Sequence, residues 1–233
     1  MKNKISRINN RLKDFFKNRE LEVGVDEVGR GCLFGRVYAA AVMWNSFDDC
    51  SYFKVCDSKK LNKGDLVHSS GCIKTHAIDF GIGYETPRYI ETNNILNSSI
   101  YSMHKSLDKL VVPVENIIVD GNKFKTWTND EGMKIQYDCI VKGDAKFKSI
   151  AAASIIAKVA RDKYIYDIVE QFPELNKYEI AKNKGYGTPA HINALQKYGT
   201  TPFHRKTYKI VKDIDFENEY FNKIDQEVIN NWL

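Results

Sequence analysis

Near its start the chain carries an apolar run that ends in two carboxylates, and it reads Leu21-Glu22-Val23-Gly24-Val25-Asp26-Glu27-Val28-Gly29-Arg30-Gly31. Residues 23–25 predict a buried strand. Adjacent carboxylates at a strand end repel each other unless a cation lies between them, and glycines let a backbone approach a ligand closely. The stretch therefore predicts a divalent metal ion beside a phosphate-bearing partner. A salt-bridged strand end is the simpler interpretation of the acidic pair alone.

Strands and helices alternate in the pattern that surrounds this stretch. Further strands are predicted at 37–44, 80–86, 114–119 and 135–141, and helices at 94–110, 149–166 and 189–198, with an irregular segment at 171–187. The loop Asp57-Ser58-Lys59-Lys60-Leu61 leads towards another helix, with Ser58 as its expected cap. This order is typical of a mixed α/β fold.

Three parts are expected along the 233 residues. They are a basic N-terminal segment (1–20), one central domain (21–212) and an acidic tail (213–233). We expect the tail to be a solvated appendage, helical near Trp232. One domain of ordinary to large size fits this length, and we expect a monomer.

Composition narrows the class of protein. No window approaches about eighteen unbroken apolar residues, so no membrane span is predicted, and the polar, basic start of the chain does not resemble a secretory signal. The five cysteines are scattered, which disfavours a disulfide framework or a zinc site and favours a reduced, cytoplasmic compartment. Basic ends with acidic clusters between them fit a protein that binds a polyanion and cations. Solvated surface charge explains the same composition more simply.

Acidic residues follow the apolar ends of three predicted strands, at Asp26, Asp120 and Asp144. Strands of one sheet can bring such ends together, and hard carboxylate oxygens favour Mg²⁺ or Mn²⁺ over zinc. Two such ions are the usual device for displacement at phosphorus. Each residue also has a structural interpretation, because Asp120-Gly121 is a common turn dipeptide and Asp144 suits a helix start.

Two glycine-containing loops are candidates for contact with nucleic acid. Gly29, Gly31 and Gly35 loosely match a dinucleotide fingerprint, but a strand rather than a helix follows them, so we reject that motif. The remaining interpretations are a tight hairpin turn, or backbone N–H groups offered to a sugar-phosphate with Arg30 adding charge. The second loop, residues 182–188, mixes lysines, glycines and Tyr186, which is typical of sequence-tolerant nucleic-acid contacts and also of an ordinary anchored loop.

Taken in order, these segments resemble the ribonuclease HII family (type 2 ribonuclease H). The resemblance covers about residues 21–208 and includes Val23–Gly31, Asp57–Leu61, Ile118–Gly121, Lys142–Ala145, Ser149–Lys158, Arg161-Asp162, Lys184–Thr188 and His204-Arg205. It implies a ribonuclease-H-like mixed β-sheet flanked by helices, with a helical C-terminal extension lining the substrate channel. It also implies cleavage of the RNA strand of RNA–DNA hybrids, and of single ribonucleotides embedded in duplex DNA. Two divalent ions would take part, leaving a 5′-phosphate and a 3′-hydroxyl.

The resemblance implies roles for individual residues. The family's four metal-binding carboxylates match Asp26, Glu27, Asp120 and Asp144. The loop that senses the 2′-hydroxyl beside the cleaved phosphate matches Gly29, Arg30 and Gly31. The tyrosine that stacks on the deoxyribose after an RNA–DNA junction matches Tyr186. Lys59 falls in a matching lysine segment and is expected to contact a backbone phosphate.

The chain departs from the family pattern after the Gly-Arg-Gly loop. Prolines and a small residue are usual there, whereas this chain has Cys32, Phe34 and Arg36, and Asn183 stands where histidine is common. We therefore expect a less rigid loop, with Arg36 facing the nucleic acid. Because no carboxylate is missing, these changes bear on substrate preference more than on activity.

Two rival functions and one further partner fit parts of this sequence. A ribonuclease HIII usually has lysine at the position of Arg30 and a long N-terminal substrate-binding domain, and only about twenty residues precede the first strand here. A non-catalytic hybrid-binding module predicts a broken carboxylate set. The C-terminal Gln226-x-x-Ile229-x-x-Trp232-Leu233 loosely resembles a sliding-clamp-binding peptide. An amphipathic tail end is the simpler interpretation, because the pattern is short and its last position is not aromatic.

Overall fold

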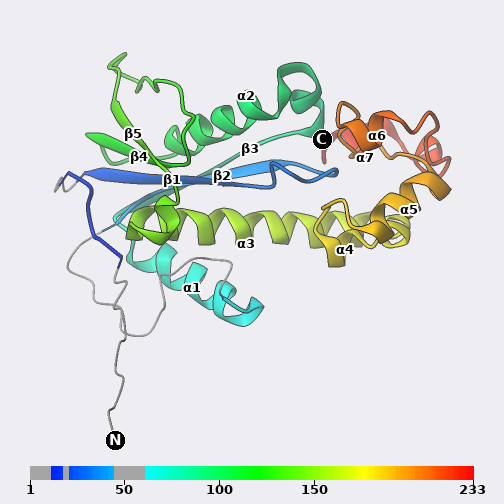
Figure 1. The fold of residues 1–233 in the computed structure, drawn as a ribbon, viewed down its shortest axis with the longest axis horizontal. Helices are drawn as coiled ribbons and strands as arrows, with labels where there is room; N and C mark the ends of the chain where they lie inside the picture. Colours follow the sequence, from blue (N-terminus) through cyan, green and yellow to red (C-terminus); the bar gives the residue numbers. More distant parts are fainter. Residues whose placement is uncertain (1–11, 18–20, 45–60) are drawn as a thin grey trace, which may run out of the picture.

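A five-stranded mixed sheet forms the centre of the computed structural model, which describes residues 12–17, 21–44 and 61–233. The strand order is β3-β2-β1-β4-β5. The strands are β1 (Glu22–Val28), β2 (Val37–Met43), β3 (Asp79–Glu85), β4 (Asn116–Asp120) and β5 (Gln136–Ile140). β1, β2 and β3 pair antiparallel, while β1, β4 and β5 pair parallel (Figure 1). The predicted mixed α/β sheet is confirmed.

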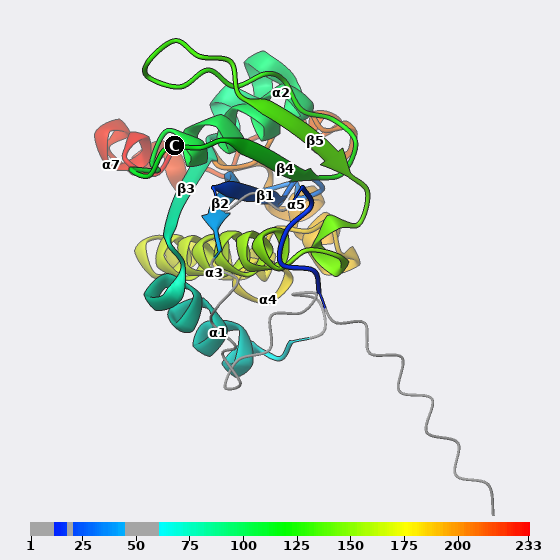
Figure 2. The ribbon, with the colours of Figure 1, turned by 90° about the vertical axis from the view of Figure 1, so that its left-hand side faces the viewer.

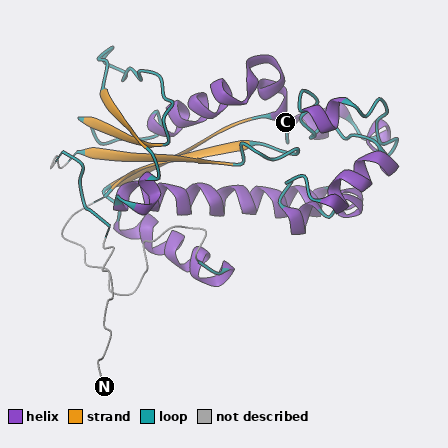
Figure 3. Cartoon of the chain, viewed as in Figure 1, coloured by secondary structure: helices purple, strands orange, loops and turns teal. Residues whose placement is uncertain are grey.

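Helices cover both faces of the sheet (Figures 1 and 2). α2 (Pro87–Leu107) lies on one face, and α3 (Lys148–Gln171) with α1 (Lys63–His76) lies on the other. Short helices follow α3 and form the C-terminal part of the molecule (Figure 3). They are α4 (Ile180–Asn183), α5 (Pro189–Tyr198), α6 (Lys209–Lys212) and α7 (Gln226–Asn230), with the 3₁₀ turns η3 (Pro173–Tyr178) and η4 (Phe221–Lys223). A further 3₁₀ turn, η2 (Gly143–Ala145), precedes α3.

The central strand β1 is buried on both faces because its alternating side chains enter two different cores. Val23 and Val25 pack in the core that contains the α2 residue Met103. Gly24 faces α3, where an added Cβ would lie 2.3 Å from the Ile150 nitrogen. Glycine at this position therefore lets the start of α3 press directly against the strand that carries Asp26 and Glu27.

Helix boundaries differ from the predicted ones for local reasons. α2 begins at Pro87, earlier than the expected residue 94, because the Thr86 side chain caps it by accepting a hydrogen bond from the Tyr89 nitrogen at 3.2 Å. The helix is interrupted at Asn94, whose φ of 61° is left-handed. The segment expected to be irregular, 171–187, contains η3 and α4. The expected cap at Ser58 lies outside the described residues.

The expectation of a solvated C-terminal tail was wrong. Phe221 and Ile229 are at most 2% exposed and belong to the core around α3, and the Trp232 ring contacts Tyr164 with centroids 6.2 Å apart. The tail ends in α7, just before Trp232. Apolar side chains spaced along this acidic segment are buried. The net charge of the segment did not indicate their burial.

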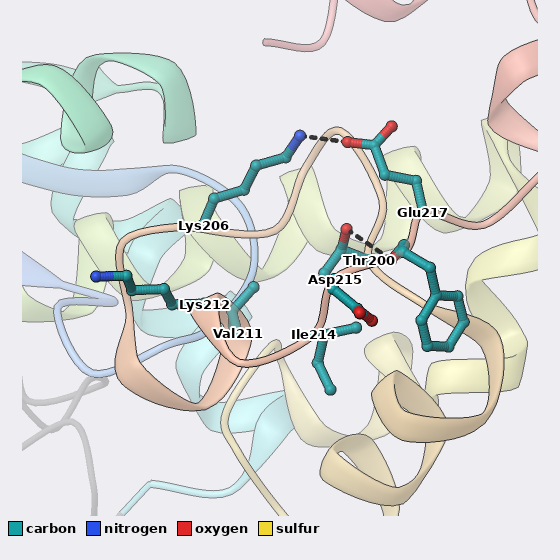
Figure 4. Close-up of a pocket in the computed structure, with 8 residues that line it drawn as sticks. Thr200, Lys206, Val211, Lys212, Ile214, Asp215 and Glu217 are labelled. Atoms are coloured by element: carbon teal, nitrogen blue, oxygen red, sulfur yellow. Dashed lines mark hydrogen bonds and ion pairs between the residues drawn. The ribbon is translucent and has the colours of Figure 1, made fainter.

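Polar contacts also hold the first part of the tail against the domain. The Phe216 carbonyl accepts a 3.0 Å hydrogen bond from the Thr200 nitrogen, and Lys206 forms an ion pair with Glu217 (Figure 4). Across the residues that the structure describes, no helix has both the length and the apolar character needed to cross a bilayer.

Candidate active site

One cavity of about 320 Å³ brings together all four carboxylates that the sequence pointed to. Asp26 and Glu27 lie near the C-terminal end of strand β1, and Asp120 is the last residue of the parallel neighbouring strand β4. Asp144 lies in η2, the turn that precedes α3. Residues far apart in the chain therefore meet because β1 and β4 run in the same direction and α3 returns beside them.

The turn that carries Asp144 is tied to Asp120. The Gly143 nitrogen donates a 2.6 Å hydrogen bond to Asp120 Oδ1. At the other side of the cavity, the Glu27 nitrogen donates to Asp26 Oδ1 at 2.7 Å. Backbone N–H groups thus orient two of the carboxylates while leaving them oxygens with which to bind a cation.

Negative charge accumulates in this cavity at an electrostatic cost. Burial, and then the charges of Glu27 and Asp120, raise the pKa of Asp26 well above its usual value, against a hydrogen bond from Ser154. Burial also raises the pKa of Glu27, although Arg30 opposes the shift. The pKa of Asp120 is raised by burial as well. A bound cation would relieve this repulsion.

The donor set fits small divalent cations, because carboxylate oxygens are the ligands that Mg²⁺ and Mn²⁺ prefer. Within the described residues, no three His, Cys, Asp or Glu side chains are already spaced as ligands of one ion. The carboxylates share the cavity and would have to draw closer around the ions. The structure thus gathers the acidic residues in one cavity.

The loop after β1 forms one wall of the cavity. Gly29 has φ of +94°, and an added Cβ would lie 2.4 Å from Arg161 Nε, so this position requires glycine for two reasons. Arg30 is half exposed and its Nη1 lies 3.3 Å from Glu27 Oε1. Arg30 therefore contributes positive charge at the rim, next to the carboxylates.

The loop that carries Tyr186 pairs with this wall. The Leu33 nitrogen donates to the Gly185 carbonyl at 2.8 Å, and Tyr186, 46% exposed, also lines the cavity. The buried Asn183 side chain shapes the loop, because it donates to the Tyr178 carbonyl at 2.7 Å and accepts from the Gly185 nitrogen at 2.8 Å. Lys59 lies outside the described residues.

A family model described as Ribonuclease HII matches residues 23–211. The chain belongs to the ribonuclease HII family. Two curated ribonuclease HII proteins are similar to it over most of its length. That of Christiangramia forsetii is 42% identical over 88% of this chain and 100% of its own. That of Porphyromonas gingivalis is 41% identical over 83% of this chain and 92% of its own.

Solved structures share the ribonuclease HII fold of this chain at lower identity. The ribonuclease H2 of Pyrococcus horikoshii has a TM-score of 0.68 and 23% identity, covering 87% of this chain and 99% of that one. RNase HII of Archaeoglobus fulgidus, solved in a PCNA:RNase HII complex, has a TM-score of 0.65 and 22% identity over 81% and 95%. Bst-RNase HIII in complex with Mn²⁺ has a TM-score of 0.57 and 20% identity over 82% and 68%.

The residues that depart from the usual ribonuclease HII pattern are not directed at a substrate. Cys32 and Phe34 are fully buried. Arg36 was expected to face the nucleic acid, and this was wrong. Its guanidinium lies between the rings of Tyr84 and Tyr164, 4.2 and 4.8 Å from their centroids. The two aromatic faces offer Arg36 cation–π contacts, and its Nη2 also donates to the Asn231 carbonyl of the C-terminal tail at 3.5 Å.

Sequence reasoning assigned no role to two buried arginines that brace the Gly-Arg-Gly loop. Arg205 Nε donates to the Gly35 carbonyl at 2.9 Å, and its Nη1 donates to the Arg30 carbonyl at 3.1 Å. Arg161 Nη2 donates to the Phe34 carbonyl at 3.3 Å. These bonds hold the loop backbone in place, and the expected loss of loop rigidity stays a prediction. Both arginines stand in stretches that resemble the family, but only the fold shows that they turn the loop carbonyls inward.

A pair of buried histidines holds the Tyr186 loop. The Thr201 nitrogen donates to His204 Nδ1 at 3.0 Å, so His204 carries its proton on Nε2 and donates it to His191 Nε2, 3.0 Å away. His191 must then donate from Nδ1 to the Tyr186 carbonyl at 2.9 Å. The chain of hydrogen bonds is complete only when both imidazoles are neutral. The two histidines are 13 residues apart in the chain, so no local pattern in the sequence indicated the pair.

Proposed function

We propose that this protein is a metal-dependent endonuclease that cuts the RNA strand of RNA–DNA hybrids and cuts at single ribonucleotides embedded in duplex DNA. Membership of the ribonuclease HII family establishes the coarser statement, ribonuclease H activity on RNA–DNA hybrids. The observation that carries the finer proposal is the single cavity shared by four carboxylates, the Gly-Arg-Gly loop and Tyr186. Ribonucleotide removal during DNA replication and repair is the process that such an activity serves.

Asp26, Glu27, Asp120 and Asp144 would hold two divalent ions, Mg²⁺ or Mn²⁺. When bound, such ions activate water and stabilise charge on the leaving oxygen, so that cleavage leaves a 5′-phosphate and a 3′-hydroxyl. The chain's contribution is to keep these carboxylates together. The backbone N–H groups of Glu27 and Gly143 fix the orientation of Asp26 and Asp120.

Discrimination between RNA and DNA falls to the loop wall. Its carbonyls at Arg30, Phe34 and Gly35 are engaged by the buried arginines. The C=O and N–H of a trans peptide point in opposite directions, so the inward Arg30 carbonyl leaves the Gly31 N–H facing outward. Together with Gly29 and Arg30, this group would bind the 2′-hydroxyl that marks a ribonucleotide. Tyr186, exposed beside this loop, would stack on the deoxyribose of the following nucleotide.

Asp120→Asn tests the assigned metal role on a duplex with one embedded ribonucleotide. We expect cleavage with Mg²⁺ to fall at least about a hundredfold, since one charged metal ligand is lost. Asp167→Asn is the matched control, because Asp167 is a surface carboxylate of α3 paired with Lys163. Near-wild-type turnover by Asp120→Asn would reject the assignment, and abolition of cleavage by EDTA in the wild type is the companion measurement.

Tyr186→Ala tests recognition at an RNA–DNA junction. We expect a larger loss of kcat/KM on a single embedded ribonucleotide than on a long hybrid, since a long hybrid offers many cleavage positions without that junction. Tyr101→Ala, on the half-exposed face of α2, is the control for loss of a surface ring. Equal losses on both substrates would count against the stacking role.

A sliding clamp is a further proposed partner, in line with the PCNA:RNase HII complex known for the Archaeoglobus fulgidus protein. In the C-terminal segment, Ile229 is fully buried and Trp232 packs on the core. Clamp binding through this segment would therefore require it to leave the domain. A pull-down with a clamp and the full-length protein decides the matter, and absence of binding retires the idea. We also propose that the enzyme acts as a monomer, which light scattering would check.

A further inference from the structure

Two lysines from distant parts of the chain meet on one tyrosine ring outside the cavity. Lys184 Nζ lies 3.6 Å and Lys63 Nζ lies 4.3 Å from the ring centroid of Tyr166, which is 38% exposed. The nearby ammonium groups of Lys184, and then of Lys63, lower the pKa of Tyr166. Two cations on one ring attract the ring but repel each other. The cluster therefore presents concentrated positive charge and a polar phenol to solvent.

No carboxylate of the described residues forms an ion pair with Lys63 or Lys184, whereas nearby surface lysines are paired. Lys163 and Lys182, for example, pair with acids one helical turn away. Lys63 is also the first residue of α1, where a positive charge opposes the helix dipole. The stability of α1 therefore does not account for its position, and an external anion would.

The cluster continues from the active-site cavity along α3. Lys158, Asp162 and Tyr166 follow one another at four-residue spacing, so they lie in one row on the helix surface. Lys158 lines the cavity, and Tyr166 lies about 12 Å farther along the helix axis. Lys158 and Asp162 are half-buried, and Tyr166 at the end of the row is exposed. Lys184 gives a second connection to the cavity, because it precedes by two residues Tyr186, which lines the cavity.

The elements that supply the two lysines are held against the same helix. Both α1 and α4 pack on α3 (Figure 1). Lys63 begins α1, and Lys184 directly follows α4, where its Nζ donates to the Ala181 carbonyl. The cluster is thus a fixed feature of the fold next to the cavity, rather than a chance meeting of free side chains.

We propose that Lys63, Tyr166 and Lys184 form a second binding site for nucleic acid, which holds a backbone phosphate of the duplex that flanks the cleaved nucleotide. The inference rests on the proposed function, since it assumes that the scissile phosphate lies at the carboxylates. At about 3.4 Å per base step, the distance along α3 corresponds to about three to four nucleotides. Two ammonium groups and a phenolic hydroxyl suit a phosphate, and they carry no sequence preference.

The test varies the length of duplex on each side of one embedded ribonucleotide. Flanks of two and of ten base pairs are compared, and binding is measured by fluorescence anisotropy in EDTA at several salt concentrations. We expect wild-type affinity to fall when one particular flank is shortened. Lys63→Ala should weaken binding several-fold on the long duplex only, and lower the slope of log affinity against log salt by about 1. Lys184→Ala should do the same.

Lys163→Ala is the matched control, since Lys163 is an exposed lysine of α3 paired with Asp167. Lys63→Ala keeps the inference independent of the Tyr186 loop, which Lys184→Ala could disturb. Unchanged affinity of Lys63→Ala on the long duplex, or the same loss on both duplexes, overturns the second site. Failure of the wild type to cut either duplex with Mg²⁺ would instead overturn the proposed function, so the two failures are distinguishable.

Discussion

The two sides of the loop at residues 29–36 hold their charges in opposite ways. On the cavity side, carboxylates such as Asp26 and Glu27 lie close to one another, and burial raises their pKa values. On the interior side, Arg161 and Arg205 are buried but donate to backbone carbonyls. The first arrangement costs stability until cations arrive, and the second stabilises the fold. Mutations on the two sides should therefore affect cleavage activity and the free energy of unfolding separately.

Asp26→Asn should separate them most sharply. We expect cleavage with Mg²⁺ to fall about a thousandfold or more, equal to about 4 kcal/mol of transition-state stabilisation. The free energy of unfolding should stay the same or rise by about 1 kcal/mol, because a buried, repelled charge is removed. Urea denaturation and single-turnover cleavage measure the two effects. A clear loss of stability would break the comparison.

Arg205→Ala should have the reverse character. We expect the free energy of unfolding to fall by about 3 kcal/mol, because the Arg30 and Gly35 carbonyls lose a charged donor inside the protein. Lys209→Ala, an exposed cation four residues on, should change stability by less than about 0.5 kcal/mol. If both variants unfold at the same urea concentration, Arg205 does not support the loop.

Acid should weaken the supporting side through the histidines. Burial, and then the charge of His191, lower the pKa of His204 well below its usual value, and burial lowers the pKa of His191. Their contribution is complete above about pH 6.5 and is lost as the pH falls below that value, by at most about 1.4 kcal/mol per pH unit for each histidine. Carboxylates with raised pKa values act in the opposite direction. Urea unfolding at pH 7.5, 6.5 and 5.5 measures the sum.

His204→Gln is the comparison for this pH dependence. The variant should be less stable at pH 7.5, because the hydrogen bonds to Thr201 and His191 change, but its stability should vary less between pH 7.5 and 5.5. The same pH slope in both proteins would show that other groups control it.

Divalent metal should stabilise the cavity side by the smallest amount. Mg²⁺ at about ten times its dissociation constant should raise the free energy of unfolding by about 1.4 kcal/mol. Asp26→Asn should lose most of this gain, whereas Arg205→Ala should keep it. A Mg²⁺-induced shift of the same size in wild type and Asp26→Asn would place the bound ion elsewhere.

Local patterns predicted the sheet and the acidic cluster well. The apolar run of β1 followed by Asp26-Glu27, and the run of β4 followed by Asp120, are visible because strand burial and strand ends leave a signal within a few residues. Gly29 is similarly legible, since a left-handed turn requires glycine. The boundaries of α2 were less accurate, because its capping residue Thr86 was assigned to the preceding strand.

Long-range partners were not predictable in the same way. Arg36 was expected at the substrate, but Tyr84 and Tyr164 enclose it, and the acidic tail was expected in solvent, but Ile229 is buried. The residues next to Arg36 and next to Ile229 in the sequence do not indicate these contacts. The tail is acidic, but its net charge led to the wrong prediction that it is exposed to solvent.

By itself the sequence determined the order of elements, the carboxylates at strand ends and the two glycine loops, because each depends on neighbours within a few residues. Only the tertiary structure decided that four carboxylates share a cavity, that Arg161 and Arg205 turn the loop carbonyls inward, and that Lys63 and Lys184 meet on Tyr166. Those arrangements depend on which distant segments pack together, and burial and charge act through space rather than along the chain.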